Sequence, residues 1–216
     1  MDRAYGSPTF HSLNPLTLHM VTASTTPDEL LRQALNNIYP VDVDTLNDYI
    51  ARWQPVEFRR KTIINGAGSS EKYLYYVLEG IQKSSFDSAG KEYIVAFSYP
   101  GTFSGDPVSL FLGAPSNVTL ACISDSRFLR LGYSTHQQYL ARHRQLESLF
   151  RRATELLLAG VLERYGELMA LTIEERFKAF TSRSAHLLNV IPHKDLASYL
   201  RIDPTNFSKL INAVKI

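Results

Sequence analysis

Cysteine is nearly absent from this sequence, with Cys122 the single one among 216 residues. One cysteine excludes a disulfide framework within the chain and any zinc or iron–sulfur site built from several thiolates. Cys122 lies in the apolar run 118–123, so we expect a buried small side chain rather than a reactive thiol. The sequence also lacks a bilayer-spanning apolar run of roughly 20 residues and a signal-like N-terminus. These absences predict a cytoplasmic protein.

Residue patterns that carry catalysis are also missing. Residues 56–131 contain no histidine, which argues against a metal enzyme on a cupin-like barrel, and no paired carboxylates, nucleophile–base pair or Gly-x-x-x-x-Gly-Lys pattern replaces it. The six histidines show no metal-ligand or haem-ligand spacing. We therefore expect no enzyme, no metal and no resident cofactor, and interpret the histidines as surface or capping residues: His11, His19, His136, His143, His186 and His193.

Charge is low overall and unevenly distributed, with a formal net charge of +2. Residues 26–133 carry 10 Lys and Arg against 12 Asp and Glu, whereas residues 172–216 carry 7 against 4. The balances are therefore −2 and +3. A basic C-terminal segment fits a nucleic-acid-binding module attached to another domain. On charge alone, an ordinary solvated surface explains the difference more simply.

The last thirty residues predict two short helices joined by a tight turn. Pro192 and Pro204 each suit the first position of a helix, and Asp203 suits the N-cap of the second. The pattern is typical of a helix-turn-helix, whose second helix enters the DNA major groove. Ala197 is small enough to let the two helices cross closely. The two helices share an apolar seam, which is formed by Leu196, Leu200, Ile202, Phe207 and Leu210.

Candidate DNA-binding residues follow from helices expected at about 193–200 and 204–213. Asn206 suits adenine, Lys209 suits guanine or a phosphate, and Thr205 and Ser208 suit either. A solvated helix face explains each of these residues equally well. His193, Lys194 and Arg201 are candidates for phosphate contacts, which position a protein without reading sequence.

Arg201 occupies the turn position that usually holds glycine, because the backbone there tends toward positive φ. A bulky residue at this position predicts a slightly altered turn. The segment 182–191, before the first helix, is too short for a β-hairpin wing. Double-stranded DNA is the partner that these residues predict.

The rest of the chain divides into three further parts. Residues 1–25 are rich in Ser, Thr and Pro and predict a loose N-terminal arm. Residues 26–134 predict a sensor domain with helices starting near Thr26 and Asp44, followed by antiparallel strands in a barrel or sandwich. The expected strands are 58–64, 73–78, 81–86, 93–99, 118–123 and 128–131.

One long helix is expected over residues 135–166, followed by a 167–216 module that holds a helix near 173–181 and the helix-turn-helix. Five residues that recur three and four positions apart along this helix predict the seam of a coiled-coil dimer. The same residues could also pack within the chain. The seam consists of Phe150, Ala153, Leu157, Gly160 and Arg164, and Leu149, Leu156 and Val161 beside it are expected to cover the barrel.

The order of barrel, long helix and helix-turn-helix resembles the Crp/Fnr superfamily of bacterial transcription regulators. The most specific stretches are 61–68, 74–80, 87–92 and 100–106. The resemblance implies an α+β fold: an antiparallel β-barrel or jelly roll with flanking helices, similar to a cyclic-nucleotide-binding domain, then the dimerisation helix and the helix-turn-helix domain. It also implies a homodimer that binds a two-fold operator near promoters, where RNA polymerase would be a further partner.

The resemblance weakens at the ligand site. Gly105-Asp106 matches the Gly-Glu pair with which family members hold the ribose of cyclic AMP (cAMP), but Ser116-Asn117 replaces their phosphate-binding Arg and the residue after it. No Lys or Arg lies between residues 105 and 123. A buried phosphate without a cation is costly to desolvate. We therefore expect another small effector, or none, at these four residues.

By the same resemblance, the base-reading positions fall on Pro204, Thr205 and Lys209. Proline cannot make a polar base contact, so we expect an operator different from that of the cAMP regulator. Two functions remain open. The first is a dimeric transcription regulator, and the second is a small-molecule-binding or protein-interaction module with a weak or vestigial DNA-binding domain.

Overall fold

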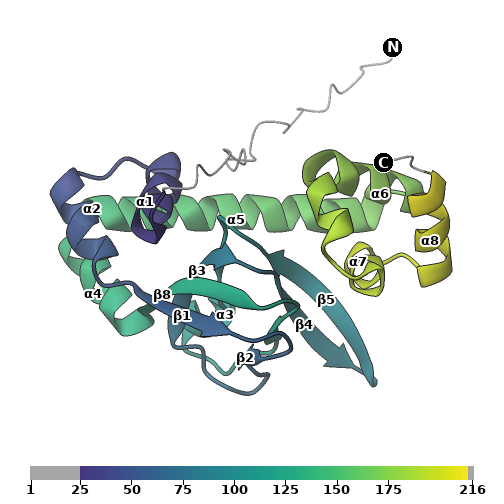
Figure 1. Cartoon of the computed structure of the whole chain (residues 1–216), viewed down its shortest axis with the longest axis horizontal. Helices are drawn as coiled ribbons and strands as arrows, with labels where there is room; N and C mark the ends of the chain where they lie inside the picture. Colours follow the sequence, from purple (N-terminus) through teal and green to yellow (C-terminus); the bar gives the residue numbers. More distant parts are fainter. Residues whose placement is uncertain (1–24, 214–216) are drawn as a thin grey trace, which may run out of the picture.

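The computed structural model describes residues 25–213 of the chain. Apart from its last residue, the predicted N-terminal arm lies outside the described residues. The fold is α+β, as expected: strands form a two-sheet sensor domain, and helices form both ends of the molecule. Figure 1 shows the long helix α5 running from the N-terminal helices to the C-terminal helices, with the sheets beside it.

Two N-terminal helices, α1 (Pro27–Ile38) and α2 (Val43–Ile50), begin with side-chain caps. The Thr26 hydroxyl accepts the Glu29 N–H at 3.3 Å, and one Asp42 carboxylate oxygen accepts two N–H groups of the first turn of α2. Such caps satisfy backbone donors that have no partner inside the helix. The buried faces of both helices cover one face of a β-sheet in the sensor domain.

The sensor domain contains two antiparallel four-stranded sheets. One has the order β1-β8-β3-β6 and the other β2-β7-β4-β5. The strands are β1 (Gln54–Phe58), β2 (Ile63–Asn65), β3 (Tyr73–Glu79), β4 (Gln82–Ser88), β5 (Lys91–Ser98), β6 (Phe103–Ser104), β7 (Thr119–Cys122) and β8 (Ser126–Gly132).

The single strand expected over 58–64 is wrong, because the chain changes sheets there. Lys61 adopts φ 70°, which breaks the extended backbone between β1 and β2. β1 then pairs with β8 in one sheet, and β2 pairs with β7 in the other. The expected burial of Cys122 is confirmed at 4% exposure, and this burial raises the pKa of its thiol.

The first sheet separates two apolar clusters. Tyr76, Leu129 and Leu131 pack against α1, α2 and α5. Tyr75 and Phe128 lie on the opposite face, inside the barrel, with their ring centres 5.5 Å apart. Alternate residues of a strand point to opposite faces, so the outer face anchors the helices and the inner face lines the sensor interior.

The expected continuous helix over 135–166 is also wrong, because two helices occupy this region. They are α4 (Tyr133–Arg142) and α5 (Arg144–Ala170), and His143 between them has φ −126° and ψ 99°. The backbone is therefore extended at His143 and cannot continue the helix. The break lets α4 fold back on the sensor while α5 extends to the C-terminal helices (Figure 1).

His136 on α4 is a buried residue, which corrects its interpretation as a surface or capping histidine. It is 4% exposed, its Nδ1 lies 2.9 Å from the Tyr49 hydroxyl, and its ring centre lies 4.4 Å from that of Phe150. Burial lowers the pKa of His136 to about 4. The ring therefore contributes to the core as a neutral side chain at neutral pH.

The C-terminal module consists of α6 (Ile173–Ser184), a short 3-10 helix (Ala185–Asn189), α7 (His193–Leu200) and α8 (Pro204–Ala213). Thr172 and Glu175 form a reciprocal capping box at the start of α6. Within this described stretch no strand separates α6 from α7, in agreement with the expected lack of a wing. None of the helices in the described part of the chain is long and apolar enough to cross a bilayer.

Candidate functional site

The turn between α7 and α8 keeps the left-handed backbone that glycine usually provides. Arg201 has φ 55° and ψ 41°, so the expected positive φ is confirmed and the expected change of the turn is wrong. A non-glycine residue in this conformation costs about 1 kcal/mol. Arg176 of α6 holds the turn, because its guanidinium donates hydrogen bonds to the carbonyl oxygens of Leu200 (3.1 Å) and Arg201 (3.2 Å).

The start of α8 follows the sequence prediction. Pro204 is its first residue, and an Asp203 carboxylate oxygen accepts the N–H groups of Thr205 at 2.9 Å and Asn206 at 3.4 Å. Pro192 differs from expectation by one position, because it is the N-cap of α7 rather than its first residue.

The apolar seam orients α8 so that its candidate base-reading residues face solvent. Phe207 is 1% exposed and packs edge-on against Phe177 of α6 with ring centres 5.7 Å apart. The candidate base-reading residues of α8 are all exposed. The Ser208 hydroxyl donates its one hydrogen to the Pro204 carbonyl oxygen at 3.0 Å, so it has no further hydrogen to donate. These exposed residues are Pro204, Thr205, Asn206, Ser208 and Lys209.

The candidate phosphate-binding residues are exposed but already have neighbours. The His193 ring lies 5.8 Å from that of Phe207. The Arg201 guanidinium lies 4.9 Å from the ring centre of Tyr93, which belongs to β5 of the sensor domain. The structure therefore brings the helix-turn-helix into direct contact with the sensor, a relationship that no local sequence signal indicated.

The predicted ligand residues of the sensor surround the short helix α3 (Pro107–Leu112). Asp106 is its N-cap, with a carboxylate oxygen 3.0 Å from the Val108 N–H. Gly105 has φ +134°, and a Cβ there would lie 3.3 Å from the Tyr73 carbonyl oxygen. Glycine is thus needed for both backbone conformation and space.

Ser116 and Asn117 do not provide the missing cation site. Ser116 is buried, and its hydroxyl donates to the Val118 carbonyl at 2.8 Å and accepts the Val118 N–H at 3.1 Å. Asn117 is exposed. The serine therefore stabilises the loop itself, so these two residues do not fit the cyclic phosphate of a nucleotide.

A cation that the sequence analysis missed comes from β8. Arg130 is directly opposite Tyr75, and Tyr75 is opposite Ser104, so the three share the inner face of the sheet. The Arg130 guanidinium lies 4.7 Å from the Tyr73 ring centre, and its buried Nε has no hydrogen-bond partner among the described residues. A charged residue alternating with Phe128 in an apolar strand was the available signal.

The sensor domain also contains two buried carboxyl groups. Glu71 is 8% exposed and Asp106 is 5% exposed, and each has one carboxylate oxygen without a hydrogen-bond partner in the described chain. Burial raises the pKa of Glu71, and the Asp106 charge raises it further. Two buried carboxyl groups at helix α3 disfavour an anionic ligand beside it.

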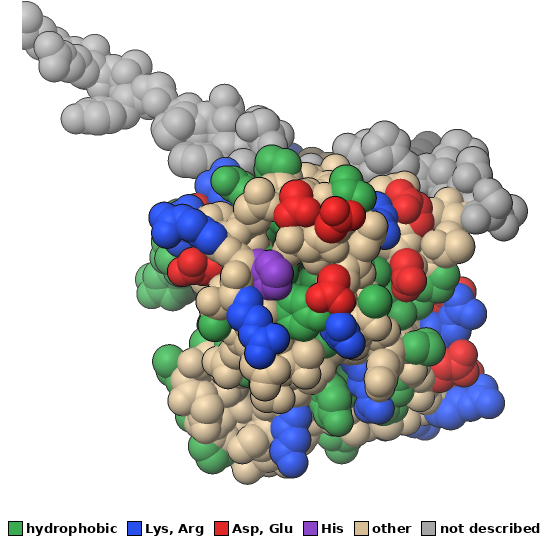
Figure 2. Space-filling model, turned by 90° about the vertical axis from the view of Figure 1, so that its left-hand side faces the viewer, with side chains coloured by type: hydrophobic (Ala, Val, Ile, Leu, Met, Phe, Trp, Pro, Cys, Tyr) green, Lys and Arg blue, Asp and Glu red, His purple; other side chains and the backbone are tan. Residues whose placement is uncertain are grey.

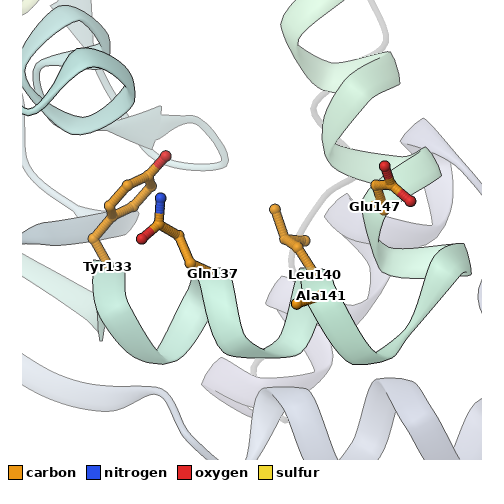
Figure 3. Close-up of a pocket in the computed structure, with 5 residues that line it drawn as sticks. All are labelled: Tyr133, Gln137, Leu140, Ala141 and Glu147. Atoms are coloured by element: carbon orange, nitrogen blue, oxygen red, sulfur yellow. The ribbon is translucent and has the colours of Figure 1, made fainter.

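Two hollows lie elsewhere on the molecule. A groove of about 480 Å³ lies between α4 and α5, where Figure 3 shows Tyr133, Gln137 and Leu140 on α4 facing Glu147 on α5. The second hollow, of about 150 Å³, lies between β5 and the C-terminal helices. Figure 2 shows acidic and basic side chains interspersed at the α2–α4 end, so this end presents no single-sign surface for a charged polymer.

The predicted dimer seam divides in the structure. Phe150 packs into the sensor core, with its ring centre 5.9 Å from that of Tyr49, and Arg164 contacts Tyr199 of α7. Ala153 is half-buried, whereas Leu157 is exposed and a Cβ at Gly160 would meet nothing within 4 Å. Leu149 is buried, as expected, and Leu156 is half-buried.

An exposed apolar stripe on α5 is rotated by about one residue from the predicted seam. Val161, expected to cover the barrel, is 56% exposed, which corrects that expectation. We call the following set the α5 stripe: Leu158, Val161, Leu162, Tyr165 and Met169, which are 56–71% exposed.

Comparison with known proteins identifies the sensor domain. Residues 55–143 match the family of cyclic nucleotide-binding domains. The match runs from β1 to the end of α4. A search of curated protein sequences found no match.

Solved structures share the arrangement of the sensor domain with the C-terminal helices. FixK2 from Bradyrhizobium japonicum is 20% identical, with a TM-score of 0.65, over 74% of this chain and 83% of that one. CLP from Xanthomonas campestris, a c-di-GMP-responsive global regulator, is 18% identical with a TM-score of 0.57, over 80% and 91%. The catabolite activator protein of Thermus thermophilus is 20% identical with a TM-score of 0.53, over 83% and 85%.

These likenesses confirm the resemblance to the Crp/Fnr superfamily in fold. This chain is similar to these regulators in fold. The ligand, the DNA contacts and the oligomeric state of the chain depend on particular residues and not on the fold.

Proposed function

We propose that this chain is a homodimeric DNA-binding transcription regulator whose sensor domain responds to an effector other than cAMP held in the usual way. The observation that carries the proposal is the α7–α8 unit. Its left-handed turn at Arg201 and the buried Phe207 leave the polar side of α8 facing solvent. A recognition helix needs this geometry to enter a major groove.

In this function, Asn206 and Lys209 read base edges and Thr205 contacts a base or a phosphate. The Ser208 hydroxyl, which donates to the Pro204 carbonyl, accepts a hydrogen bond from a base. His193, Lys194 and Arg201 bind phosphates and fix the position of the helix. The C-terminal segment carries a balance of +3, so binding depends on a few placed cations and is strongly weakened by salt.

The α5 stripe supports dimerisation. Leu158, Leu162, Tyr165 and Met169 are spaced four, three and four residues apart, which is the spacing of a two-stranded coiled-coil seam. All four side chains are exposed in the single chain. Burying the α5 stripe against a second copy would remove this apolar surface from water. It would also relate the two helix-turn-helix units by the two-fold axis of the dimer.

The sensor chemistry supports a different effector. Ser116 and Asn117 supply no cation, and Glu71 and Asp106 place buried carboxyl groups near the start of α3. A ligand rich in hydrogen-bond donors suits these groups better than a cyclic phosphate.

Selection of sheared genomic DNA by the purified, ligand-free protein tests the proposal. We expect enrichment of a palindrome with half-sites about one helical turn apart. The Lys209→Ala variant is the matched control and should enrich the palindrome less. If neither the ligand-free protein nor the protein with cAMP enriches any sequence, the proposal of DNA reading is wrong for these conditions and the binding-module alternative gains.

A further inference from the structure

The outer edge of β5 faces α7 instead of another strand. β5 is the last strand of its sheet, and an edge strand normally leaves backbone groups without partners. Here the Ser198 hydroxyl oxygen accepts the Ile94 N–H at 3.2 Å and donates to the Glu92 carbonyl oxygen at 3.4 Å. A serine on the helix-turn-helix therefore takes the place of a neighbouring strand.

A charged contact joins the same elements. The Lys83 ammonium on β4 lies 2.7 Å from a Glu92 carboxylate oxygen and 3.7 Å from a carboxylate oxygen of Asp195 on α7. The side chains of Lys83 and Asp195 are only 17% and 7% exposed. Lys83 thus links the β4–β5 hairpin to α7 where solvent screens charge weakly.

Two candidate phosphate-binding cations lie close to this hairpin. The Arg201 guanidinium lies over the Tyr93 ring, at 4.9 Å from its centre. Burial alone would raise the pKa of Glu92, but hydrogen bonds and charge from Lys83, a hydrogen bond from Ser85 and the charge of Lys194 lower it. Glu92 is therefore an anion that attracts Lys194 and would repel a nearby DNA phosphate.

We propose that the β4–β5 hairpin is an autoinhibitory latch, in which Tyr93 holds Arg201 against the sensor and competes with DNA phosphates for it, while Glu92 adds negative charge beside this contact. The latch rests on the proposed DNA-binding function, and it supplies the route by which the sensor controls that function. The hollow of about 150 Å³ beside the contact, lined by Phe97, Tyr99 and Tyr199 among others, shows that this interface is incompletely packed.

The test measures binding of a random-sequence DNA duplex over a series of salt concentrations. We expect Glu92→Gln and Tyr93→Ala each to tighten binding several-fold, and the double variant by roughly tenfold, with a steeper salt dependence because freed cations release more counterions from DNA. Asp87→Asn is the matched control. Asp87 faces Glu92 across the hairpin, is exposed, and forms no hydrogen bond or ion pair with α7 within the described residues.

A second measurement keeps the latch separate from folding. Hydrogen exchange at the Ile94 amide reports its hydrogen bond to Ser198. We expect Ser198→Ala, and the addition of duplex to the wild-type protein, to speed exchange at Ile94 while the core strand β8 stays protected. Thermal unfolding of Glu92→Gln should match that of the wild-type protein, since this substitution keeps the side-chain volume.

The outcomes distinguish the latch from the proposed function. If wild-type protein binds duplex and the hairpin variants bind equally or more weakly, the latch is wrong and DNA binding stands. If only the hairpin variants bind, both ideas gain. If neither wild type nor variants bind at any salt concentration, both are wrong. Unchanged Ile94 exchange on adding a duplex that does bind would also overturn the latch.

Discussion

The guanidinium of Arg164 lies 4.4 Å from the ring centre of Tyr199 and donates a hydrogen bond to the carbonyl oxygen of the same residue. Arg164 belongs to α5 and Tyr199 to α7. One side chain therefore joins the long helix to the first helix of the helix-turn-helix. This contact fixes the angle at which α5 presents the C-terminal module.

Loss of this contact should destabilise the C-terminal module. Arg164→Ala removes a charge-assisted hydrogen bond and a cation–π contact, so we expect the free energy of unfolding to fall by ~1–3 kcal/mol. Urea unfolding followed by circular dichroism measures the change. Arg151→Ala is the control, because Arg151 forms only an exposed ion pair with Glu155 on the same helix and should matter by less than ~1 kcal/mol. Equal losses would contradict the assignment.

Lys209 is the most direct test of base reading by α8. We expect Lys209→Ala to weaken operator binding by ~1–3 kcal/mol and to relax specificity at one position if the lysine contacts a base. If Lys209 contacts only a phosphate, binding should weaken uniformly across sequences. Fluorescence anisotropy with matched operator and scrambled duplexes separates the two cases. Lys178→Ala, a change at an exposed residue of α6, is the control. A Lys209 variant that binds like wild type would remove this residue from the interface.

Dimerisation is tested on both candidate faces of α5. Leu162→Glu places a charge in the α5 stripe and should convert a dimer to a monomer in sedimentation velocity, because an unpaired buried charge is strongly unfavourable. Gly160→Leu tests the predicted seam; the single chain tolerates it because a Cβ there meets nothing within 4 Å.

Val43→Glu, a change at a 68% exposed residue on α2, is the control for added charge. Disruption by Leu162→Glu alone places the interface on the stripe. Disruption by Gly160→Leu alone places it on the predicted seam. An intact dimer in both variants would mean that the chains associate elsewhere.

His136 should make the sensor core sensitive to acid. Its pKa is about 4 in the folded protein and about 6.5 when exposed, so the unfolded state binds more protons between these values. The stabilisation is complete above pH 6.5 and is lost as the pH falls toward 4, by up to ~3 kcal/mol. Urea unfolding across this range measures the loss.

His136→Gln should flatten the dependence, at the expense of a lower stability at neutral pH. His186→Gln, a change at an exposed histidine, should leave it intact. A loss of stability that is equally steep in all three proteins would assign it to other groups.

Local chemistry predicted several elements well. Thr26 and Asp203 cap helices because their oxygens reach backbone N–H groups two or three residues ahead, which needs no tertiary contact. The apolar seam of α7 and α8 was equally visible, because helical spacing places Leu196, Leu200 and Phe207 on facing surfaces. The same spacing placed the turn at Arg201, although the altered backbone expected there was wrong.

Other features depended on residues far apart in the sequence. Arg130 entered the sensor interior because strand pairing placed it opposite Tyr75, 55 residues earlier in the chain. Phe150 turned toward the core because α4 folds back at His143, which helical periodicity alone does not reveal. The contact of Arg201 with Tyr93 joins two modules.

The sequence by itself determined the order of the modules, the helix caps, the apolar faces and the lack of a cation in residues 105–123. These features arise from interactions within a few residues or from composition. Only the tertiary structure decided which faces are buried, that Arg130 enters the sensor interior, and that the sensor hairpin touches α7. Burial and charge proximity depend on how distant strands and helices pack, because one neighbouring element decides whether an exposed side chain becomes a core, latch or interface residue.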